Sequence, residues 1–393
     1  METKTQNFQP VAGCYQLQPT GYRAFIPAPL DLGTEWASGN LQVLLSRADR
    51  ALGRLDGSVQ TLPNPDLFVF MYVRKEAVLS SQIEGTQSSL QDLLAAEADL
   101  LGGSTRPRDV EEVVNYVRAM HHGLNRLADL PVSVRLIREI HAVLLQGVRG
   151  GQHTPGELRR SQNWIGPAGC TLATATFIPP PPEQVPEALG DLENFLHQQN
   201  DTPLLIKIGL AHAQFKTIHP FLDGNGRVGR LLITFLLCER GVLHKPVLYL
   251  SHFFKHHRQA YYDHLQAVRD RGDWEGWLSF FLRGVAEVSA EATETARRIL
   301  LLREEHRAAL TERLGRGAGN GHKVLESLFD RPIVSVGDVQ TMMGTTYAAA
   351  NNLVARLNEL GILIEVTGQA RNRRFRYEPY IRLFTEDSPD TAT

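Results

Sequence analysis

Two strongly apolar segments, 204–215 and 231–237, constrain the fold more than any other feature of this chain. Each is apolar enough to be a buried helix. The stretch between them, 218–230, is therefore expected to form a loop joining two buried helices. It contains one histidine, one aspartate, three glycines and two arginines. So many polar residues at a turn inside the protein predict a functional site.

The second half of this stretch has the residues of a phosphate site. Gly224, Asn225 and Gly226 stand where the second helix should begin, and glycines leave backbone N–H groups accessible to a ligand. Unpaired N–H groups and the positive end of the helix dipole favour an anion there. Arg227 and Arg230, three residues apart, project from about the same face, and guanidinium groups suit phosphate oxygens.

Asp223 and His219 add the other groups that phosphate chemistry needs. Asp223 immediately precedes the glycines and is a hard ligand for a divalent cation that bridges phosphates. His219 can accept a proton near neutral pH. Read singly, each residue has an ordinary explanation as a core histidine, a plain turn or a solvated arginine. Together and in this order they predict a catalytic site for a phosphate compound.

Residues 219–230 are similar to the signature HPFx(D/E)GNGRxxR of the Fic (filamentation induced by cAMP) family, without a departure. The resemblance implies transfer of AMP from ATP to a protein hydroxyl. It implies that His219 is the base and that Asp223 holds Mg²⁺, with Mn²⁺ as the alternative metal. The ATP contacts that it implies are Gly224, Asn225, Gly226, Arg227, Val228, Gly229 and Arg230.

A second motif lies upstream, at the end of a helix expected from about residue 64 to Ser80. Ser80 and Glu84 are four residues apart, hence on one helical face, and Gly85 suits a left-handed helix end. A glutamate at a helix C-terminus opposes the dipole, so its charge needs another reason. The stretch resembles the inhibitory motif (S/T)xxxE(G/N) of Fic proteins. This resemblance implies that Glu84 pairs with Arg230 and blocks placement of the ATP γ-phosphate.

Residues 157–182 are the first with β character, and we expect a hairpin with an open edge. The order PGxxR, NWIG and PP resembles the Fic flap, which implies a segment lying over the active site. An exposed edge could take a segment of a target protein as an added strand. The alternative is an ordinary two-stranded ribbon. The residues expected to dock the target are Thr171, Leu172, Ala173, Thr174, Ala175 and Thr176.

Helical spacing of apolar residues recurs through most of the remaining chain, while the proline-rich residues 1–33 are expected to be irregular. The histidines between the two motifs, among them His141, show no ligand spacing and are expected to be surface or filler residues. Tyr261 and Tyr262 would ordinarily belong to the core. Because they follow the signature at a position that resembles the family's base pocket, they are also expected to contact adenine.

The C-terminal part begins after a glycine-rich stretch, 315–321, which is expected to be a linker. The order of helices and strands after it resembles a winged helix, with Arg373 and Arg374 in the wing, so DNA is a candidate partner. Residues 321–384, however, hold eight Lys or Arg against six Asp or Glu, which predicts only a small phosphate footprint. Protein contact, including a homodimer, is equally compatible.

Composition and charge argue against several classes of binding partner and site. The net charge of −2 gives no global steering toward nucleic acid or anionic membranes. The three cysteines, Cys14, Cys170 and Cys238, are odd in number and form no CxxC, so neither a disulfide framework nor a thiolate zinc site is indicated. The N-terminus lacks the apolar core of a signal peptide, and no stretch of about 18 apolar residues could span a bilayer. We therefore expect a cytoplasmic protein without a membrane partner.

The sequence thus predicts a mostly α protein with a Fic helical core, a short β-hairpin flap and a C-terminal winged helix-turn-helix domain. The expected parts are an N-terminal helical region (1–105) with the inhibitory helix, a catalytic core (106–314), the linker (315–321), and a winged-helix domain with a tail (322–393). The expected function is a protein adenylyltransferase, autoinhibited by Glu84, that modifies Ser, Thr or Tyr of a target protein and of itself. One alternative is a metal-dependent hydrolase that removes AMP at the same site. Another is a DNA-binding regulator whose Fic core senses nucleotide.

Overall fold

The computed structural model describes most of the chain, namely residues 12–30, 39–62, 65–99, 108–148, 150–152, 154–167, 169–369 and 372–385. The domain boundary expected near residue 105 lies outside these ranges, so it stays a prediction. Helices dominate the described residues, as expected for a mostly α protein. No helix in these ranges is long and apolar enough to cross a membrane.

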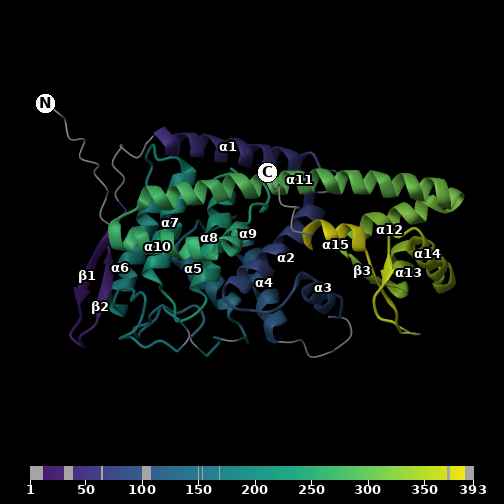
Figure 1. Ribbon diagram of the computed structural model, residues 1–393. Coiled ribbons are helices and arrows are strands. Elements are labelled where there is room, and N and C mark those ends of the chain that lie inside the picture. The colour runs from purple at the N-terminus through teal and green to yellow at the C-terminus, as the bar shows by residue number, and fades with distance from the viewer. Residues whose placement is uncertain are drawn as a thin grey trace.

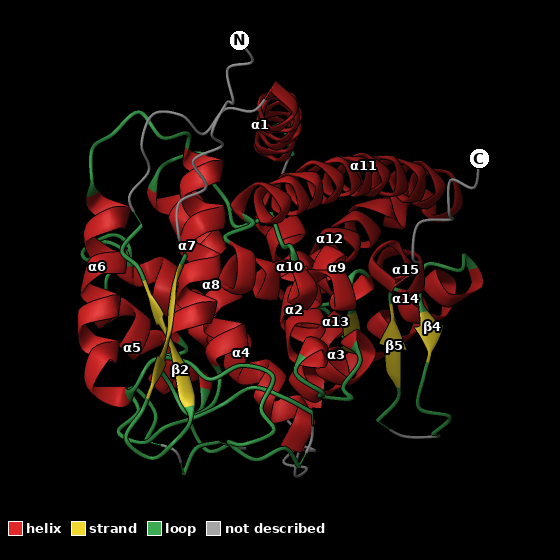
Figure 2. Ribbon diagram, turned by 60° about the vertical axis from the view of Figure 1, so that its left-hand side comes forward, coloured by secondary structure: helices red, strands yellow, loops and turns green. Residues whose placement is uncertain are grey.

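The two apolar segments form the central helices α7 (Leu204–Ile218) and α8 (Asn225–Glu239). All of α7 after its first residue is buried, and so is α8 as far as Leu237, which confirms the expectation of two buried helices. Figures 1 and 2 show them inside the larger part of the molecule. The helices that pack against them are α2 (Pro65–Ile83), α4 (Arg108–Arg126), α5 (Val134–Leu144), α6 (Val185–His197), α10 (Arg258–Arg271) and α11 (Trp274–Leu314).

The longest helix, α11, joins this larger part to the C-terminal part, and α1 (Gly39–Gln60) packs along it (Figure 1). Asp273 caps the start of α11 by accepting a hydrogen bond from the Gly276 N–H at 2.9 Å. Trp277 in its first turns is fully buried, and its indole N–H donates to the carbonyl of Gly209 in α7 at 2.8 Å. The shorter helices α3 (Leu90–Asp99), η1 (Pro182–Gln184) and α9 (Ser251–His256) complete this part.

The N-terminal segment is a hairpin rather than the expected irregular arm. Strands β1 (Gly13–Leu17) and β2 (Arg23–Pro27) pair antiparallel, with Tyr15 opposite Phe25. The Phe25 side chain is buried against Phe177, and its N–H donates to the carbonyl of Ile178 at 2.9 Å. The prolines suggested an irregular backbone, but Pro19 lies in the turn between the strands and Pro27 ends β2, so neither interrupts a strand.

The hairpin expected within 157–182 is also wrong in its extent. The described part of this segment contains a single antiparallel bridge, between Ile165 and Phe177. Between them the chain makes a tight turn in which the N–H of Thr171 donates to the Thr174 hydroxyl and the N–H of Thr174 donates to the carbonyl of Thr171, both at 3.0 Å. These local bonds use backbone groups that a strand ladder would need, so the alternating pattern does not become a strand.

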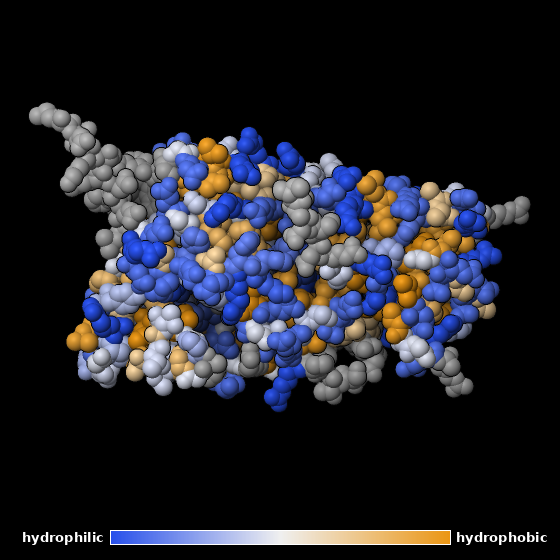
Figure 3. Space-filling view, viewed as in Figure 1, coloured by the Kyte–Doolittle hydropathy of each residue, from blue (hydrophilic) through white to orange (hydrophobic). Residues whose placement is uncertain are grey.

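The C-terminal part has the expected helix, helix-turn-helix and two-stranded hairpin in that order, and in addition a short strand after the first helix and a final helix. The helices are α12 (Ala318–Asp330), α13 (Val336–Met343), α14 (Tyr347–Glu359) and α15 (Glu378–Thr385). The strands β3 (Ile333–Ser335), β4 (Ile364–Glu365) and β5 (Arg374–Arg376) form an antiparallel sheet in the order β3-β5-β4. The expected linker is helical, because η2 (Gly315–Gly317) runs directly into α12. Hydrophobic residues gather at this end of the face seen in Figure 3.

We predict that close packing between α4 and α8 makes Gly123→Ala destabilising. A Cβ at Gly123 would overlap the ring of Phe235, and overpacking of this kind costs roughly 1–3 kcal/mol. Gly190 in α6 has no neighbour within 4 Å of the same position, so Gly190→Ala should instead stabilise by up to about 1 kcal/mol. The melting temperatures of the two variants and the wild type measure both effects. An equal drop in melting temperature in the two variants would contradict this packing argument.

Candidate active site

His219 stands immediately after α7 in a left-handed conformation, with φ 50° and ψ 61°. This conformation costs a residue with a side chain roughly 1–2 kcal/mol, so other contacts must hold it. One brace comes from Asn225, whose Oδ1 accepts from the Phe221 N–H at 2.9 Å and whose Nδ2 donates to the Phe221 carbonyl at 2.8 Å. Gly224, at φ 77°, then supplies the left-handed turn from which α8 begins.

Two side chains from the segment 157–182 hold the same loop from outside. Arg159 Nε donates to the carbonyl of His219 at 2.9 Å, and Asn163 Nδ2 donates to the carbonyl of Phe221 at 2.8 Å. The backbone N–H of Arg159 donates to the carbonyl of Pro220 at 2.9 Å. Neither Arg159 nor Asn163 is among the predicted site residues, although both belong to the patterns PGxxR and NWIG. Those patterns were the signal that could have found them.

His141 supports the loop from α5 and is not the filler residue that its spacing predicted. Its ring stacks on Phe221 with centroids 3.7 Å apart and an interplanar angle of 6°. Because the Gly156 N–H donates to Nδ1 at 2.8 Å, Nε2 carries the proton and donates to the carbonyl of Asp223 at 3.0 Å. Burial lowers the pKa of His141 to about 4, so the ring stays neutral and keeps both bonds at neutral pH.

The imidazole of His219 is held in its neutral form. Burial, followed by the positive charges of Lys216, Arg159 and Arg269, lowers the pKa of His219 well below its ordinary value. Its Nδ1 is buried and has no hydrogen-bond partner among the described residues. A neutral imidazole has one acceptor nitrogen, so this side chain can take up a proton from a ligand.

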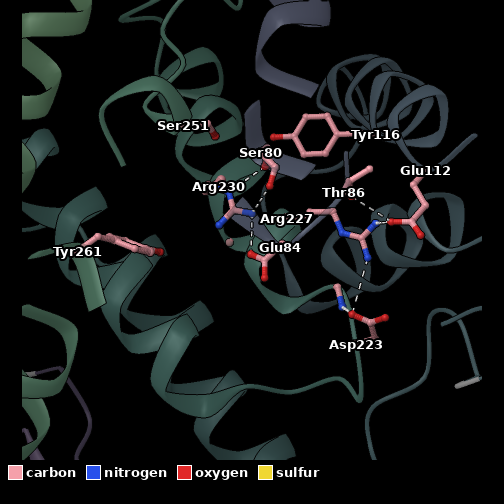
Figure 4. A network of polar contacts seen from close by, with 12 residues as sticks. Ser80, Glu84, Thr86, Glu112, Tyr116, Asp223, Arg227, Arg230, Ser251 and Tyr261 are labelled. Carbon is pink, nitrogen blue, oxygen red and sulfur yellow. Dashed lines mark hydrogen bonds and ion pairs between the residues drawn. The ribbon is translucent and has the colours of Figure 1, made fainter. Parts of the chain in front are cut away.

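Arg230 is bound by the two residues of the upstream motif, as Figure 4 shows. Its Nε donates to the hydroxyl of Ser80 at 2.8 Å, and its Nη2 donates to the Ser80 carbonyl at 2.9 Å and to Glu84 Oε1 at 2.7 Å. The Arg230 side chain is only 1% exposed. The end of α2 is therefore fastened to the first turns of α8 through one arginine.

Glu84 also lies against the N-terminal turn of α8, since a Cβ on Gly226 would overlap its Oε1. This is the end of a helix where the dipole and free N–H groups favour an anion. Burial by itself would raise the pKa of Glu84, but the positive charges of Arg230 and Lys216 outweigh it and lower the pKa to about 2. Glu84 is therefore an ionised carboxylate in an anion position.

Arg227 has different partners from Arg230. Its Nη1 lies 3.4 Å from Oε2 of Glu112 in α4, and its Nη2 lies 3.7 Å from Oδ1 of Asp223 (Figure 4). The Arg227 and Glu112 side chains are almost fully buried, at 2% and 4% exposure. The sequence placed both arginines beside one anion, whereas Arg227 links α8 to α4 and to the aspartate of the loop.

The remaining predicted nucleotide contacts lie mostly in the core. Tyr261 is fully buried, and its hydroxyl is 2.8 Å from Nε2 of His212. Because Nδ1 of His212 lies 2.9 Å from the Gly229 carbonyl and must donate to it, the Tyr261 hydroxyl donates to Nε2. Val228 is 1% exposed. Tyr262 is half-buried, with the Arg258 guanidinium 5.3 Å above its ring, and is the better placed of the two tyrosines for a base.

The six predicted docking residues occupy the tight turn of the segment 157–182. Four of them, Thr171, Ala173, Thr174 and Thr176, are exposed, while Leu172 and Ala175 are half-buried. Trp164 in the same segment is 42% exposed, and its indole N–H donates to the carbonyl of Cys170 at 3.1 Å. The segment thus offers accessible side chains, and its role in docking stays a prediction.

We predict that the Glu84–Arg230 pair stabilises the fold in a pH-dependent way. The folded pKa of Glu84 is about 2, below the ordinary value of 4.5, so its contribution is fully present above pH 4.5 and is lost as the pH falls toward 2. Urea unfolding of the wild type and of Glu84→Gln from pH 7 to pH 3 measures it. The difference in unfolding free energy between them should shrink below pH 4.5, and a constant difference would contradict the pairing.

Two models of a known protein family match the segments that form this site. Residues 42–125 match the model of the Fic/DOC family N-terminal region, and residues 131–237 match the model of the Fic/DOC family. The second match ends within α8 and contains the whole stretch from His219 to Arg230.

Two curated relatives are named as protein adenylyltransferases. A probable protein adenylyltransferase of Aquifex aeolicus is 31% identical over 179 residues, which are 45% of this chain and 51% of that protein. Protein adenylyltransferase Fic of Aedes aegypti is 28% identical over 197 residues, 50% of this chain and 35% of that protein. The chain therefore spans about half or less of the length of these relatives.

The fold also matches a solved structure. The crystal structure of a Fic family protein from Desulfovibrio desulfuricans G20 has a TM-score of 0.57 and 20% sequence identity, and the match covers 90% of this chain and 98% of that chain. The shared fold thus extends well beyond the segments that the family models match. The two family models therefore assign the segments 42–125 and 131–237 of this chain to the Fic/DOC family.

Proposed function

We propose that this protein is an adenylyltransferase that transfers AMP from ATP to a Ser, Thr or Tyr hydroxyl of a protein. The observation that carries the proposal is the place of Glu84, whose carboxylate lies against Gly226 at the start of α8 and binds Arg230. An anion is the natural ligand of such a helix end, and a phosphate of ATP would compete for it. The names of the two relatives support the same reaction.

The triphosphate of ATP would lie along the first turn of α8. Backbone N–H groups around Gly224 and Gly226 face it, and Arg230 fixes the γ-phosphate. Nη1 of Arg230 is buried and has no partner among the described residues, which suits this role. Asn225 and Arg227 contribute by holding the phosphate-binding loop in shape. Asn225 braces the loop, and Arg227 pairs with residues around it.

Asp223 fits a divalent cation. Its side chain is 38% exposed, and its Oδ1 accepts from the Gly224 N–H, while Oδ2 has no hydrogen bond within the described ranges. No cluster of three or more His, Cys, Asp or Glu forms a metal site among the described residues. One protein carboxylate suits Mg²⁺ or Mn²⁺, which completes its shell with phosphate oxygens and water. Such an ion would neutralise phosphate charge.

His219 is the proposed general base. The target hydroxyl oxygen bonds to the α-phosphorus of ATP, the bond from this phosphorus to pyrophosphate breaks, and the hydroxyl proton passes to the imidazole. The lowered pKa of His219 keeps the imidazole neutral, and the neutral form can accept this proton. Because the loop backbone is braced on both sides, the base is positioned before the substrates bind.

Glu84 is the proposed inhibitor. While Glu84 binds Nη2 of Arg230 and lies against Gly226, its carboxylate occupies the place of the γ-phosphate between this arginine and the start of α8. Activity requires that Glu84 leave this position, and ATP competes with it because both are anions. Glu84 and Ser80 thus set the resting activity.

The target protein is proposed to dock on the segment 157–182, whose Thr171, Ala173 and Thr174 are exposed. Self-modification would use the same site. Since the reaction consumes ATP, we assign it to the cytoplasm.

DNA binding is not proposed, because the wing arginines already have protein partners. Arg373 donates to Asn351 at 2.7 Å, and Arg374 lies 3.5 Å from Asp338. Arg376, also in the expected wing, lies 2.5 Å from Glu378, and Arg371, the remaining arginine of that wing, lies outside the described residues. No observation favours the hydrolase or a homodimer.

We predict that His219→Ala abolishes transfer and leaves ATP binding intact, since the base does not hold the nucleotide. The assay is incorporation of labelled AMP, with ATP binding measured by calorimetry. His256→Ala, an exposed histidine outside the site, is the control and should behave as the wild type. Normal incorporation by His219→Ala would refute the base assignment.

We also predict that Glu84→Gly raises activity by freeing Arg230. After incubation with ATP and Mg²⁺, intact mass spectrometry should show a gain of one adenylyl group, larger in Glu84→Gly than in the wild type. Equal gains would contradict inhibition by Glu84. No gain in either protein would contradict self-modification and direct the test to added target proteins.

A further inference from the structure

Arg159 is a buried cation without a buried anion beside it. The residue is 3% exposed, and no carboxylate forms an ion pair with it among the described residues. Its guanidinium instead donates to four backbone carbonyls, those of His219 at 2.9 Å, Ile218 at 3.4 Å, Ser161 at 3.5 Å and Pro180. Burying an arginine is costly unless its donors are satisfied, so this arrangement needs a reason.

The acceptors supply the reason. Ile218 ends α7 and His219 follows it, so their carbonyls are among the last four or so that a helix leaves without an internal partner. The negative end of the helix dipole favours a cation at this place. A planar guanidinium can reach two successive carbonyls and a third from another segment at once, whereas the ammonium of lysine is a single point charge.

We propose that Arg159 is a positioning residue of the active site: it fixes the backbone of His219 in its left-handed conformation and thereby aims the imidazole at the reacting hydroxyl. The inference rests on the proposed function, since it concerns the base of that reaction. Arg159 does not touch the substrates. It acts through His219. Its backbone N–H ties the segment 157–182 to the catalytic loop through the Pro220 carbonyl, while its bond to Pro180 closes the segment on itself.

The charge of Arg159 adds a second effect. Together with burial and Lys216 it lowers the pKa of His219, which keeps the base neutral. The two effects can be separated by substitution. Arg159→Lys keeps the charge and loses the planar fork, while Arg159→Gln loses the charge and keeps an amide that can still donate to a carbonyl.

The experiment uses the full chain with Glu84→Gly, so that inhibition does not mask the rate. Arg159→Lys and Arg159→Gln are compared in kcat, KM for ATP, the pH profile of kcat, melting temperature and ATP affinity. Arg297 in α11 is the control, because its side chain is 62% exposed and its partner is Glu294 on the surface of the same helix. Arg297→Lys and Arg297→Gln should match the parent.

For Arg159→Lys we expect a kcat lower by roughly ten- to a hundredfold, as small misplacements of a catalytic group cause. The KM for ATP should stay within about twofold, because Arg159 does not hold the nucleotide. The acidic limb of the pH profile should not move. For Arg159→Gln it should move to higher pH, because losing the cation raises the pKa of His219.

Two results would overturn the inference. One is a parental kcat in Arg159→Lys. The other is a kcat that falls only in proportion to ATP affinity and melting temperature, since a merely structural role predicts that pattern. A Glu84→Gly parent that modifies neither itself nor added target proteins would overturn the proposed function instead. In that case NMR titration of the His219 imidazole still decides the inference, because an unchanged pKa in Arg159→Gln and an unchanged His219 spectrum in Arg159→Lys would refute it.

Discussion

The site depends on the meeting of two opposite helix ends. The last carbonyls of α7 and the first N–H groups of α8 face a short loop, and each set needs partners of opposite charge. Arg159 meets the carbonyls and Glu84 lies against the N–H end. Both partners come from segments far away in sequence, α2 and the stretch 157–182. The polarity of the two helices thus decides which side chains gather there.

Much of this was predictable because it is local. Burial of α7 and α8 follows from two apolar runs, and the turn between them follows from Gly224 and the polar residues around it. The ion pair of Glu84 with Arg230 was implied by two short motifs that match a family pattern. In each case the signal lies within a dozen consecutive residues, so a single sequence carries it.

The parts that were missed have partners that a sequence does not display. His141, Arg159 and Asn163 bind backbone carbonyls or N–H groups, which almost every residue has, so the partners themselves leave no mark in the sequence. Only the patterns PGxxR and NWIG pointed to Arg159 and Asn163. The strands were misjudged for a related reason. The alternation of residue types in 170–178 predicted a strand, but hydrogen bonds to a threonine hydroxyl form a turn there instead. Strands β1 and β2 formed where prolines had suggested an irregular chain.

Ser80 and Glu84 both bind Arg230, but they do so from parts of the chain that differ in how firmly they are held. Ser80 lies within α2, which is packed into the core, whereas Glu84 stands one residue beyond the end of that helix and precedes Gly85 at φ 100°. Rotation of a few bonds would remove the carboxylate, while the serine hydroxyl and carbonyl still hold Nε and Nη2. Arg230 would then remain pre-organised, and an anion could bind it without the cost of first ordering a long, flexible side chain.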